Sequence, residues 1–375
     1  MKRRLRDTEN NGEKLDIIHG VDMTTGEHGK EYKAAFKTET GDEDRFVVEL
    51  QYPSTSPRER FETVIPRDPT GYDPIKDIEY TIDEICLTYL PEAQSLVFRD
   101  DDSGVVRLLK RAVAKKSPSD YCKALDNFNA HIRASLADST ISKTLDSKHA
   151  LPPSLVKHIF SQVYQRIVSP HAHRLKKVKD KATTYGELMP SFVNTIFRQT
   201  HLNSSSIFVD LGSGVGNVVI QAALQTGAQS WGIEILDTPA KFASEQAKEL
   251  QARARLWGLS IGPIHLLHGS FLESPEIDDV LRVADVVLVN NKVFGERLNG
   301  ELLFKFLDLK DGAQVISLES FGAGRQGAWN QQQNAARLFR EKRYESGTDA
   351  VSWDGQSVDY FIATKDEHHV KEEDL

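Results

Sequence analysis

The segment from Ser206 to Leu224 constrains the fold of this chain more than any other. Ile207-Phe208-Val209 is a short apolar run, a glycine-rich loop follows at 210–217, and Asn217 to Leu224 reads as a buried helix. An apolar strand, a glycine-rich turn and a helix make up the unit from which parallel sheets are built. We therefore predict an α/β fold with this loop at the carboxyl end of a strand.

Apolar strands and helical segments continue to alternate after residue 224. Further strands are expected at Trp231 to Leu236, Ile264 to Leu267, Asp285 to Val289 and Gln314 to Leu318. Helices are expected from Pro239 to about Trp257 and from about Leu298 to Leu307. Two late strands, Ala350 to Trp353 and Val358 to Thr364, joined by the turn Asp354-Gly355, predict a terminal hairpin. The whole pattern predicts a parallel sheet wrapped by helices.

Composition and periodicity divide the chain into five segments. Residues 1–44 are polar and predicted to be flexible, and 45–150 form an N-terminal region with a strand at Arg45 to Tyr52 and amphipathic helices. A helical lobe is expected at 151–204, the α/β fold at 205–364 and an acidic tail at 365–375.

Charge is distributed unevenly along the chain, whose net charge is −8. The acidic balance argues against attraction of the whole surface to nucleic acid. Two basic clusters are nevertheless candidate DNA contacts, with a solvated surface as the alternative. They are Arg107, Lys110, Arg111, Lys115 and Lys116, and Arg174, Lys176, Lys177, Lys179 and Lys181.

Cysteine usage and hydropathy exclude several other classes of protein. Cys86 and Cys122 are the only cysteines, and their spacing suits neither a zinc site nor a disulfide framework, so no metal and a reducing intracellular compartment are expected. The basic start Met1 to Arg6 is not followed by an apolar stretch, which argues against a secretory signal. The apolar runs are too short to span a bilayer, so no membrane association is expected.

The spacing of the glycines in the loop discriminates between nucleotide-like ligands. Gly212, Gly214 and Gly216 give G-x-G-x-G, whereas most dinucleotide folds carry G-x-G-x-x-G. Asp210 places a carboxylate in the turn, where it would repel a pyrophosphate but attract an ammonium group. Both features favour S-adenosylmethionine over NAD. The alternative is a glycine-rich turn that binds no ligand.

Polar residues at the ends of the next strands support a ligand site at this edge of the sheet. Glu234 ends the second strand, where a carboxylate can accept hydrogen bonds from both hydroxyls of a ribose. Ser270-Phe271 follows the third strand and could hold an adenine, although Phe271 could equally be a core residue. Asn290 follows the fourth strand and could bind a substrate amine, or simply form a turn.

Five motifs in this order resemble the disruptor-of-telomeric-silencing (Dot-one) family of non-SET methyltransferases of lysine 79 in histone H3. They are Tyr185-Gly186-Glu187-Leu188, the loop Asp210 to Asn217, Asp237 to Ala243, Val289 to Gly295, and Val351-Ser352-Trp353-Asp354-Gly355. The resemblance covers about Pro152 to Thr364. It implies a class I (seven-stranded, Rossmann-like) S-adenosylmethionine-dependent methyltransferase fold with a mostly helical N-terminal lobe.

The resemblance also assigns the site residues. Cofactor contacts are implied for Tyr185, Gly186, Glu187, Leu188, Phe208, Val209, Asp210, Leu211, Gly212, Ser213, Gly214, Val215, Gly216, Asn217, Glu234, Ser270 and Phe271. The family commonly has an acid where Ser270 stands and often Gln where Asn217 stands. Asn290, Trp353 and Tyr360 match the positions that line the lysine channel, with Asn290 as a positioning group and the two aromatic residues as walls.

The function implied is methylation of histone H3 lysine 79 in nucleosomes, in the nucleus, with roles in telomeric silencing and the DNA-damage response. Partners implied are histones H3 and H4, ubiquitinated H2B, and DNA through the basic clusters. Two alternatives stay open on the sequence: a class I methyltransferase of another substrate, and a chromatin-binding module without catalysis. For Trp353 and Tyr360 the alternative role is packing of the hairpin.

Overall fold

The computed structural model describes residues 2–8, 16–38, 40–175, 186–321 and 335–367. The chain forms two compact units, which are treated separately below. The helical unit comprises Lys2–Arg166 and Lys248–Ser260, and the sheet unit comprises Ile167–Ala247 and Ile261–Leu375. The boundaries of the five predicted segments stay a prediction.

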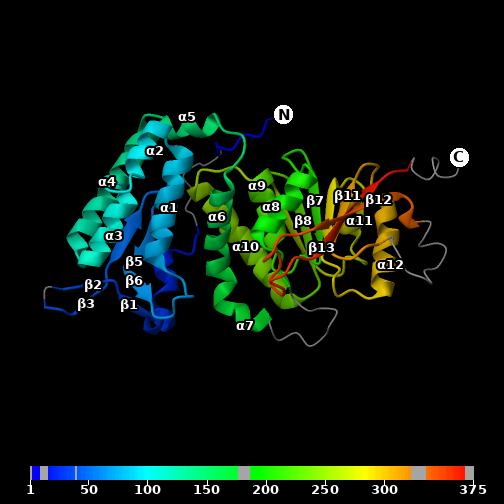
Figure 1. Ribbon diagram of the computed structural model, residues 1–375, viewed down its shortest axis with the longest axis horizontal. Coiled ribbons are helices and arrows are strands. Elements are labelled where there is room, and N and C mark those ends of the chain that lie inside the picture. Colours follow the sequence, from blue (N-terminus) through cyan, green and yellow to red (C-terminus); the bar gives the residue numbers. More distant parts are fainter. Residues whose placement is uncertain (1, 9–15, 39, 176–185, 322–334, 368–375) are drawn as a thin grey trace. The chain divides into compact units, whose positions relative to one another are not determined.

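The helical unit contains three two-stranded antiparallel sheets and a set of helices (Figure 1). Its strands pair as β1 (Tyr32–Ala34) with β6 (Val64–Pro66), β2 (Phe36–Lys37) with β3 (Glu43–Asp44), and β4 (Val47–Leu50) with β5 (Glu59–Glu62). Its helices are η1 (Gly20–Met23), η2 (Gly26–Glu31), α1 (Pro74–Tyr89), α2 (Glu92–Phe98), α3 (Val105–Lys115), α4 (Pro118–Ala137), α5 (Thr140–Asp146) and α6 (Pro153–Ile167).

The beginnings of these helices follow from local sequence. Asp73 caps α1 by accepting hydrogen bonds from the N–H groups of Ile75 and Lys76, and Pro74 occupies the first helical position, where no N–H is needed. Ser117 caps α4 in the same way ahead of Pro118. No helix of the described residues combines the length and the apolar character needed to cross a membrane.

The described residues of the N-terminal segment, 1–44, are more ordered than predicted. Residues 1–44 were expected to be flexible because their sequence shows little periodicity. The described part instead forms η1, η2, β1 and β2, and it buries Leu5, Tyr32 and Phe36. These strands are only two or three residues long, which is too short for an alternating pattern to be visible in the sequence.

A network of buried charged side chains holds the helical unit together. Arg166 Nη2 lies 2.8 Å from both Glu59 Oε1 and Asp77 Oδ2, and Arg253 Nη2 lies 2.9 Å from Glu59 Oε1. Arg253 Nε also pairs with Glu249 Oε1 at 2.6 Å. Burial disfavours ionisation of Glu59, but the charges of Arg253 and Arg166 outweigh it and lower the pKa of this carboxyl.

The sheet unit is built around one seven-stranded sheet in the order β12-β13-β11-β10-β7-β8-β9. Only β13 runs antiparallel to its neighbours. The strands are β7 (Ile207–Leu211), β8 (Gln229–Glu234), β9 (Ile264–His268), β10 (Val286–Val289), β11 (Gln314–Ser317), β12 (Phe339–Glu345) and β13 (Asp359–Lys365). The helices are η3 (Ser169–His171), α7 (Ala172–Leu175), α8 (Pro190–Gln199), α9 (Asn217–Thr226), α10 (Asp237–Leu256), α11 (Pro275–Leu281), α12 (Glu296–Lys305) and η5 (Phe306–Asp308).

Alternate side chains of the strands enter two separate cores, one on each face of the sheet. Phe208, Leu288 and Ile316 pack with α8 and α9, whereas Val209 and Val287 pack with α11 and α12. Figure 1 shows the two pairs of helices on opposite sides of the strands. Apolar residues on both faces explain the unbroken apolar runs, and the parallel sheet wrapped by helices is confirmed.

The predicted terminal hairpin is wrong in one of its strands. β13 matches the expected Val358 to Thr364, but its partner is β12 and not Ala350 to Trp353. In the latter segment Val351 makes only isolated bridges, to Leu188 and Asp354. The sequence of β12, Phe-Arg-Glu-Lys-Arg-Tyr-Glu, carries no apolar strand signal, because a strand at the edge of a sheet can be highly charged.

Candidate active site

The glycine loop joins β7 to α9 at the point where the strand order reverses, which is where ligands bind in open α/β sheets. Gly212, Gly214 and Gly216 have φ angles of +86°, +54° and +82°. Side chains other than that of glycine are strained in this left-handed region, so the three positions require glycine. The N–H groups of Gly212 and Ser213 both donate to Ile233 O, at 3.0 and 2.9 Å, which fastens the loop to β8.

Glu234, at the end of β8, also binds the loop. Its Oε2 accepts a hydrogen bond from the N–H of Gly214 at 2.9 Å, and its Oε1 accepts one from the N–H of Leu236 at 2.8 Å. Each carboxylate oxygen has two lone pairs, so acceptor capacity is left for a ligand. The carboxylate is therefore held rigidly at the edge of the site by backbone groups on both sides.

Asp210 adds a second buried carboxyl group beside Glu234. Burial, with a further contribution from the charge of Glu234, raises the pKa of Asp210 to about 8. No cationic side chain pairs with either carboxylate within the part of the chain that the structure describes. A cationic ligand would supply the missing charge and favour ionisation of Asp210.

The loop and the neighbouring strand ends enclose a cavity of about 630 Å³, which is within the size range of small-molecule sites. Most of the predicted site residues line it. They are Gly186, Glu187, Leu188, Asp210, Gly212, Ser213, Gly214, Asn217, Glu234, Ser270, Phe271, Asn290 and Trp353. Residues that are up to 168 positions apart in the sequence, such as Gly186 and Asp354, thus share one cavity.

Several predicted contacts do not lie on the cavity. Phe208, Val209 and Leu211 are fully buried, because successive residues of a buried strand point into the layers of helices, and Val215 of the loop is 1% exposed. Gly216 faces Ala243 of α10. These residues position the loop, and the prediction that they line the cofactor site is corrected accordingly. Tyr185 lies outside the described residues.

The prediction that Tyr360 forms a wall of the lysine channel is also corrected. Its side chain is 1% exposed and stacks on Tyr344, with ring centroids 5.4 Å apart. Its hydroxyl donates a hydrogen bond to Gln199 Oε1 at 2.8 Å. Side chains alternate between the two faces of β13, and that of Tyr360 points into the core that also contains residues of α8. Tyr360 therefore has the alternative role, packing.

Trp353 closes one side of the cavity over the backbone of Gly186. A Cβ atom at Gly186 would lie 2.4 Å from Cε3 of Trp353, so only glycine allows the indole to lie there. Two backbone hydrogen bonds of 2.9 Å, from the N–H of Met189 to Ala350 O and from the N–H of Ser352 to Glu187 O, join the two segments. Asn290 Nδ2 approaches Gly186 O at 3.5 Å.

Sequence reasoning missed part of the lining. Ile235, Leu236 and Leu272 follow the ends of β8 and β9, and Val293 and Phe294 follow β10. Ile235 and Val293 are 58% and 43% exposed, so they form an apolar rim. Their position within a few residues of the ends of β8, β9 and β10 is the signal that could have identified them.

The site residues fit S-adenosylmethionine. The hydroxyl oxygen of Ser213 is buried without a hydrogen-bond partner, and the space in front of Gly212 is open to a ligand that approaches the backbone. Asp210 and Glu234 supply the negative charge that a cationic ligand needs. In contrast, the described residues contain no group of three or more His, Cys, Asp or Glu side chains that could hold a metal ion.

The strand order, the single reversed strand and the glycine loop at the switch point together define a class I S-adenosylmethionine-dependent methyltransferase fold. Residues 164–365 match the family described as "Histone methylation protein DOT1". This chain belongs to the DOT1 family, and its cofactor is S-adenosylmethionine.

Relatives in fungi are similar to this chain over almost its whole length. One from Aspergillus fumigatus is 40% identical over 97% of this chain and 72% of its own length, and one from Emericella nidulans is 39% identical over 95% and 71%. Both are named "Histone-lysine N-methyltransferase, H3 lysine-79 specific". Among solved structures, an RNA methyltransferase from Salinibacter ruber in complex with S-adenosyl-L-homocysteine is 22% identical to this chain, with a TM-score of 0.33. The match covers 48% of this chain and 94% of that chain.

We predict that Gly212→Arg abolishes cofactor binding, measured by titration calorimetry. The new side chain would fill the open space in front of the loop, and the φ of +86° adds strain of roughly 1–3 kcal/mol. Gly312→Arg is the matched control, because Gly312 has a φ of +81° with open space around it but does not line the cavity. Cofactor binding by the Gly212 variant that equals that of the Gly312 variant would contradict this placement of the loop.

A second prediction concerns the dependence of stability on pH in the absence of cofactor. Because the pKa of Asp210 is raised in the folded state, the folded protein keeps a proton that the unfolded chain loses above about pH 4. The free energy of unfolding contributed by this group therefore falls as the pH rises from about 4 towards 8. Asp210→Asn should remove that fall, so the variant gains stability relative to the parent with rising pH.

Thermal unfolding at several pH values measures this difference. Asp279→Asn is the control, because Asp279 is exposed and its ion-pair partner among the described residues is the exposed Arg282. A stability difference between the Asp210→Asn variant and the parent that does not change with pH would show that Asp210 titrates at its ordinary pKa.

Proposed function

We propose that this protein transfers methyl groups from S-adenosylmethionine to lysine 79 of histone H3 in nucleosomes. Membership of the DOT1 family and the names of its fungal relatives support the substrate. The observation on which the activity rests is the single cavity that brings Asp210 and Glu234 together with Asn290 and Trp353. We also propose that 205–364 carries the chemistry together with Gly186 to Leu188, which line the same cavity.

The glycine loop side of the cavity binds the cofactor in this proposal. Glu234 is held for hydrogen bonds with ribose hydroxyls, and Asp210 faces the positively charged amino-acid end. Ser270 Oγ accepts a hydrogen bond from the N–H of Leu272 at 3.2 Å, and its own O–H and second lone pair are left for an adenine contact. When bound, S-adenosylmethionine supplies a methyl group attached to a positively charged sulfur.

The opposite side of the cavity prepares the methyl acceptor. A lysine can attack only after losing its proton, and apolar surroundings lower the pKa of an amine by disfavouring its charged form. Trp353, Phe294 and Val293 provide such surroundings, and the displaced proton passes to water. Asn290 can accept a hydrogen bond from the amine and so fix its direction of approach. No side chain is assigned as a general base.

Methylation of nucleosomes tests the proposed function directly. Radiolabelled cofactor should label histone H3 in nucleosomes, with weak labelling of free H3, and mass spectrometry should show mono-, di- and trimethyl states that accumulate distributively. Asn290→Ala should lose this activity while it keeps cofactor binding, since Asn290 contacts the acceptor. No label on nucleosomes from a protein that binds the cofactor would contradict the proposal.

Further partners follow from the family resemblance and from the charge of α3. We propose contacts with H4, ubiquitinated H2B and DNA, and a nuclear location.

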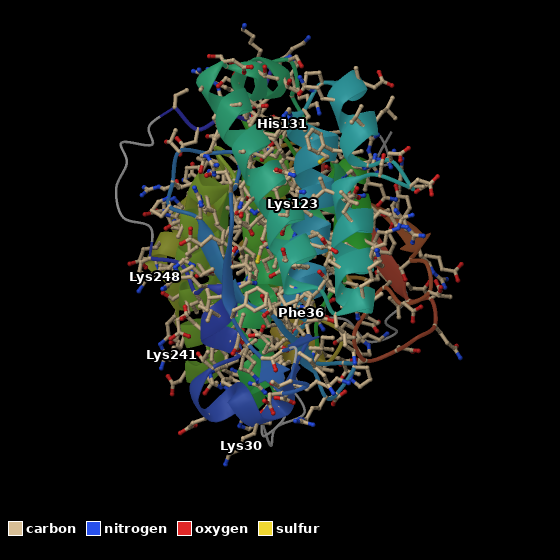
Figure 2. All side chains as sticks on the ribbon, turned by 90° about the vertical axis from the view of Figure 1, so that its left-hand side faces the viewer. Lys30, Phe36, Lys123, His131, Lys241 and Lys248 are labelled. Carbon is tan, nitrogen blue, oxygen red and sulfur yellow. The ribbon has the colours of Figure 1, made fainter. Side chains whose placement is uncertain are left out.

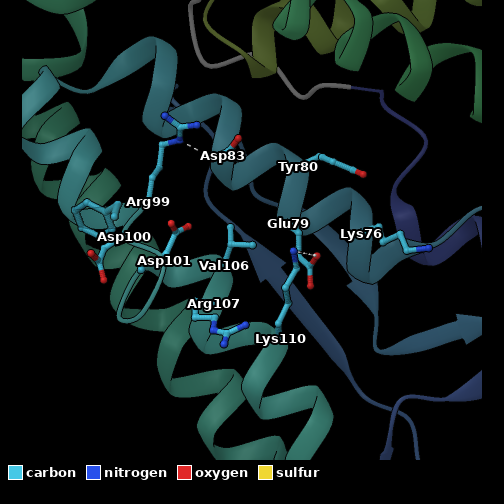
Figure 3. Close-up of a pocket in the computed structure, with 12 residues that line it drawn as sticks. Lys76, Glu79, Tyr80, Asp83, Arg99, Asp100, Asp101, Val106, Arg107 and Lys110 are labelled. Carbon is cyan, nitrogen blue, oxygen red and sulfur yellow. Dashed lines mark hydrogen bonds and ion pairs between the residues drawn. The ribbon is translucent and has the colours of Figure 1, made fainter.

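In the helical unit, Lys110 pairs with Glu79 at 3.6 Å and Arg99 pairs with Asp83 at 2.6 Å. Both ion pairs lie in a hollow between α1 and α3 (Figure 3). Arg111 pairs with Asp102, whereas Arg107, Lys115 and Lys116 form no ion pair with the residues that the structure describes. These cations are therefore free to bind phosphates.

The second basic cluster, Arg174 to Lys181, lies largely outside the described residues. Residues 176–185 lie outside the described residues, and the side chain of Arg174 is not described either. The DNA contact proposed here therefore rests on α3 alone.

We predict that Lys115→Glu/Lys116→Glu weakens nucleosome binding and flattens its dependence on salt. The slope of log K against log salt should decrease by about 0.9 for each DNA phosphate that the protein no longer neutralises. Lys30→Glu/Lys248→Glu is the control, because it reverses two charges on other elements, η2 and α10 (Figure 2). Equal slopes for the two double variants would leave the cations of α3 as ordinary surface.

A further inference from the structure

Asn291, the residue after Asn290, is fully buried and fully hydrogen-bonded. Its Oδ1 accepts from the N–H groups of Leu318 and Glu319, at 3.0 and 2.8 Å. Its Nδ2 donates to Asn299 Oδ1 at 2.9 Å and to Glu319 O at 3.1 Å. All four hydrogen-bonding positions of the amide are thus occupied.

These bonds join three elements that meet at the cavity. Asn291 follows β10, Leu318 and Glu319 follow β11, and Asn299 belongs to α12. Asn299 is also buried, and its Nδ2 donates to the carbonyl oxygens of Phe294 and Gly295, at 3.2 Å each. The loop 290–295 is therefore fixed to β11 by one asparagine and to α12 by both.

Only an amide satisfies this arrangement. A carboxylate at 291 would still accept from Leu318 and Glu319, but its second oxygen would face two acceptors, Asn299 Oδ1 and Glu319 O. An apolar side chain would leave two N–H groups buried without partners. Either change leaves polar groups unsatisfied, which costs more than an ordinary hydrogen bond contributes.

The loop held by Asn291 carries one side of the cavity. Asn290, Lys292, Val293 and Phe294 line the cavity from this loop, and Leu298 lines it from the first turn of α12. The hydrogen bonds of the glycine loop run instead to β8 and to Gln246 of α10, and they do not involve these residues. Two separate sets of bonds therefore hold the two sides of the cavity.

We propose that Asn291, with Asn299, is a positioning residue for methyl transfer. It fixes loop 290–295 so that Asn290 and Phe294 face the methyl acceptor, and it leaves the cofactor side of the cavity unaffected. The inference rests on the proposed function, because Asn290 is assigned there to the acceptor. A displacement of the loop would therefore lower the rate of transfer without weakening cofactor binding.

Kinetics of Asn291→Asp on nucleosomes test the inference. We expect kcat to fall by roughly 10- to 100-fold, as a displacement of about 1 Å of a positioning group can produce. The dissociation constant of the cofactor, measured by calorimetry, should be unchanged. Asn299→Ala removes one of the four bonds of Asn291 and both bonds of Asn299 to the carbonyl oxygens of Phe294 and Gly295. It should therefore lower kcat in the same way, and it decides the question if the first variant does not fold.

Asn129→Asp is the matched control for a merely structural effect. Asn129 is also a buried asparagine that ties separate backbone segments, since its Oδ1 accepts from Gln51 N and its Nδ2 donates to Glu49 O, each at 2.7 Å. It belongs to the helical unit and is not among the residues that line the cavity. It should lose stability without the specific loss of kcat.

The outcomes separate the inference from the proposed function. A parent protein without activity on nucleosomes would overturn both. With an active parent, a loss of kcat in Asn291→Asp no greater than in Asn129→Asp would overturn the inference alone. A cofactor dissociation constant that rises in proportion to the loss of kcat would do the same, because the loop would then serve the cofactor.

Discussion

The hydrogen bonds between the glycine loop and β8 are the constraint on which the site depends. Gly212 and Ser213 donate to one carbonyl oxygen, that of Ile233, and Gly214 donates to the carboxylate of Glu234. The left-handed backbone of the glycines lets successive N–H groups turn toward the same neighbouring strand. The loop therefore presents open backbone to the cavity, with Asp210 and Glu234 at fixed positions on either side.

Two buried carboxyl groups, Glu59 in the helical unit and Asp210 in the sheet unit, have pKa values shifted in opposite directions. In the helical unit, Arg166 and Arg253 compensate Glu59, whose pKa is lowered, and the charges serve to tie distant segments of the chain together. In the sheet unit, Asp210 has no such partner among the described residues, and its pKa rises to about 8. An uncompensated buried carboxylate is unfavourable unless a cation arrives, which is the property expected of a site for a positively charged cofactor.

The sequence predicted the parts of the fold that depend on local patterns. The strands around Phe208 and Leu288 and the helix after Asn217 were predicted because both faces of the sheet are apolar and the loop glycines are regularly spaced. β12 was missed because an edge strand exposes most of its side chains, so its sequence of alternating charges carries no apolar signal. Val351 is buried as a strand residue would be, which explains the predicted strand there, yet it makes only isolated bridges.

The chemistry at the strand ends can be derived from local sequence: the glycines that permit left-handed backbone, the carboxylates Asp210 and Glu234, and Asn290 after β10. The tertiary structure alone decided which residues reach the cavity. The side chain of Tyr360 lies in the core, and that of Trp353 lies over Gly186. The reason is physical: backbone conformation follows from neighbouring residues, whereas the direction of a side chain in a cavity follows from contacts between segments that are far apart in sequence.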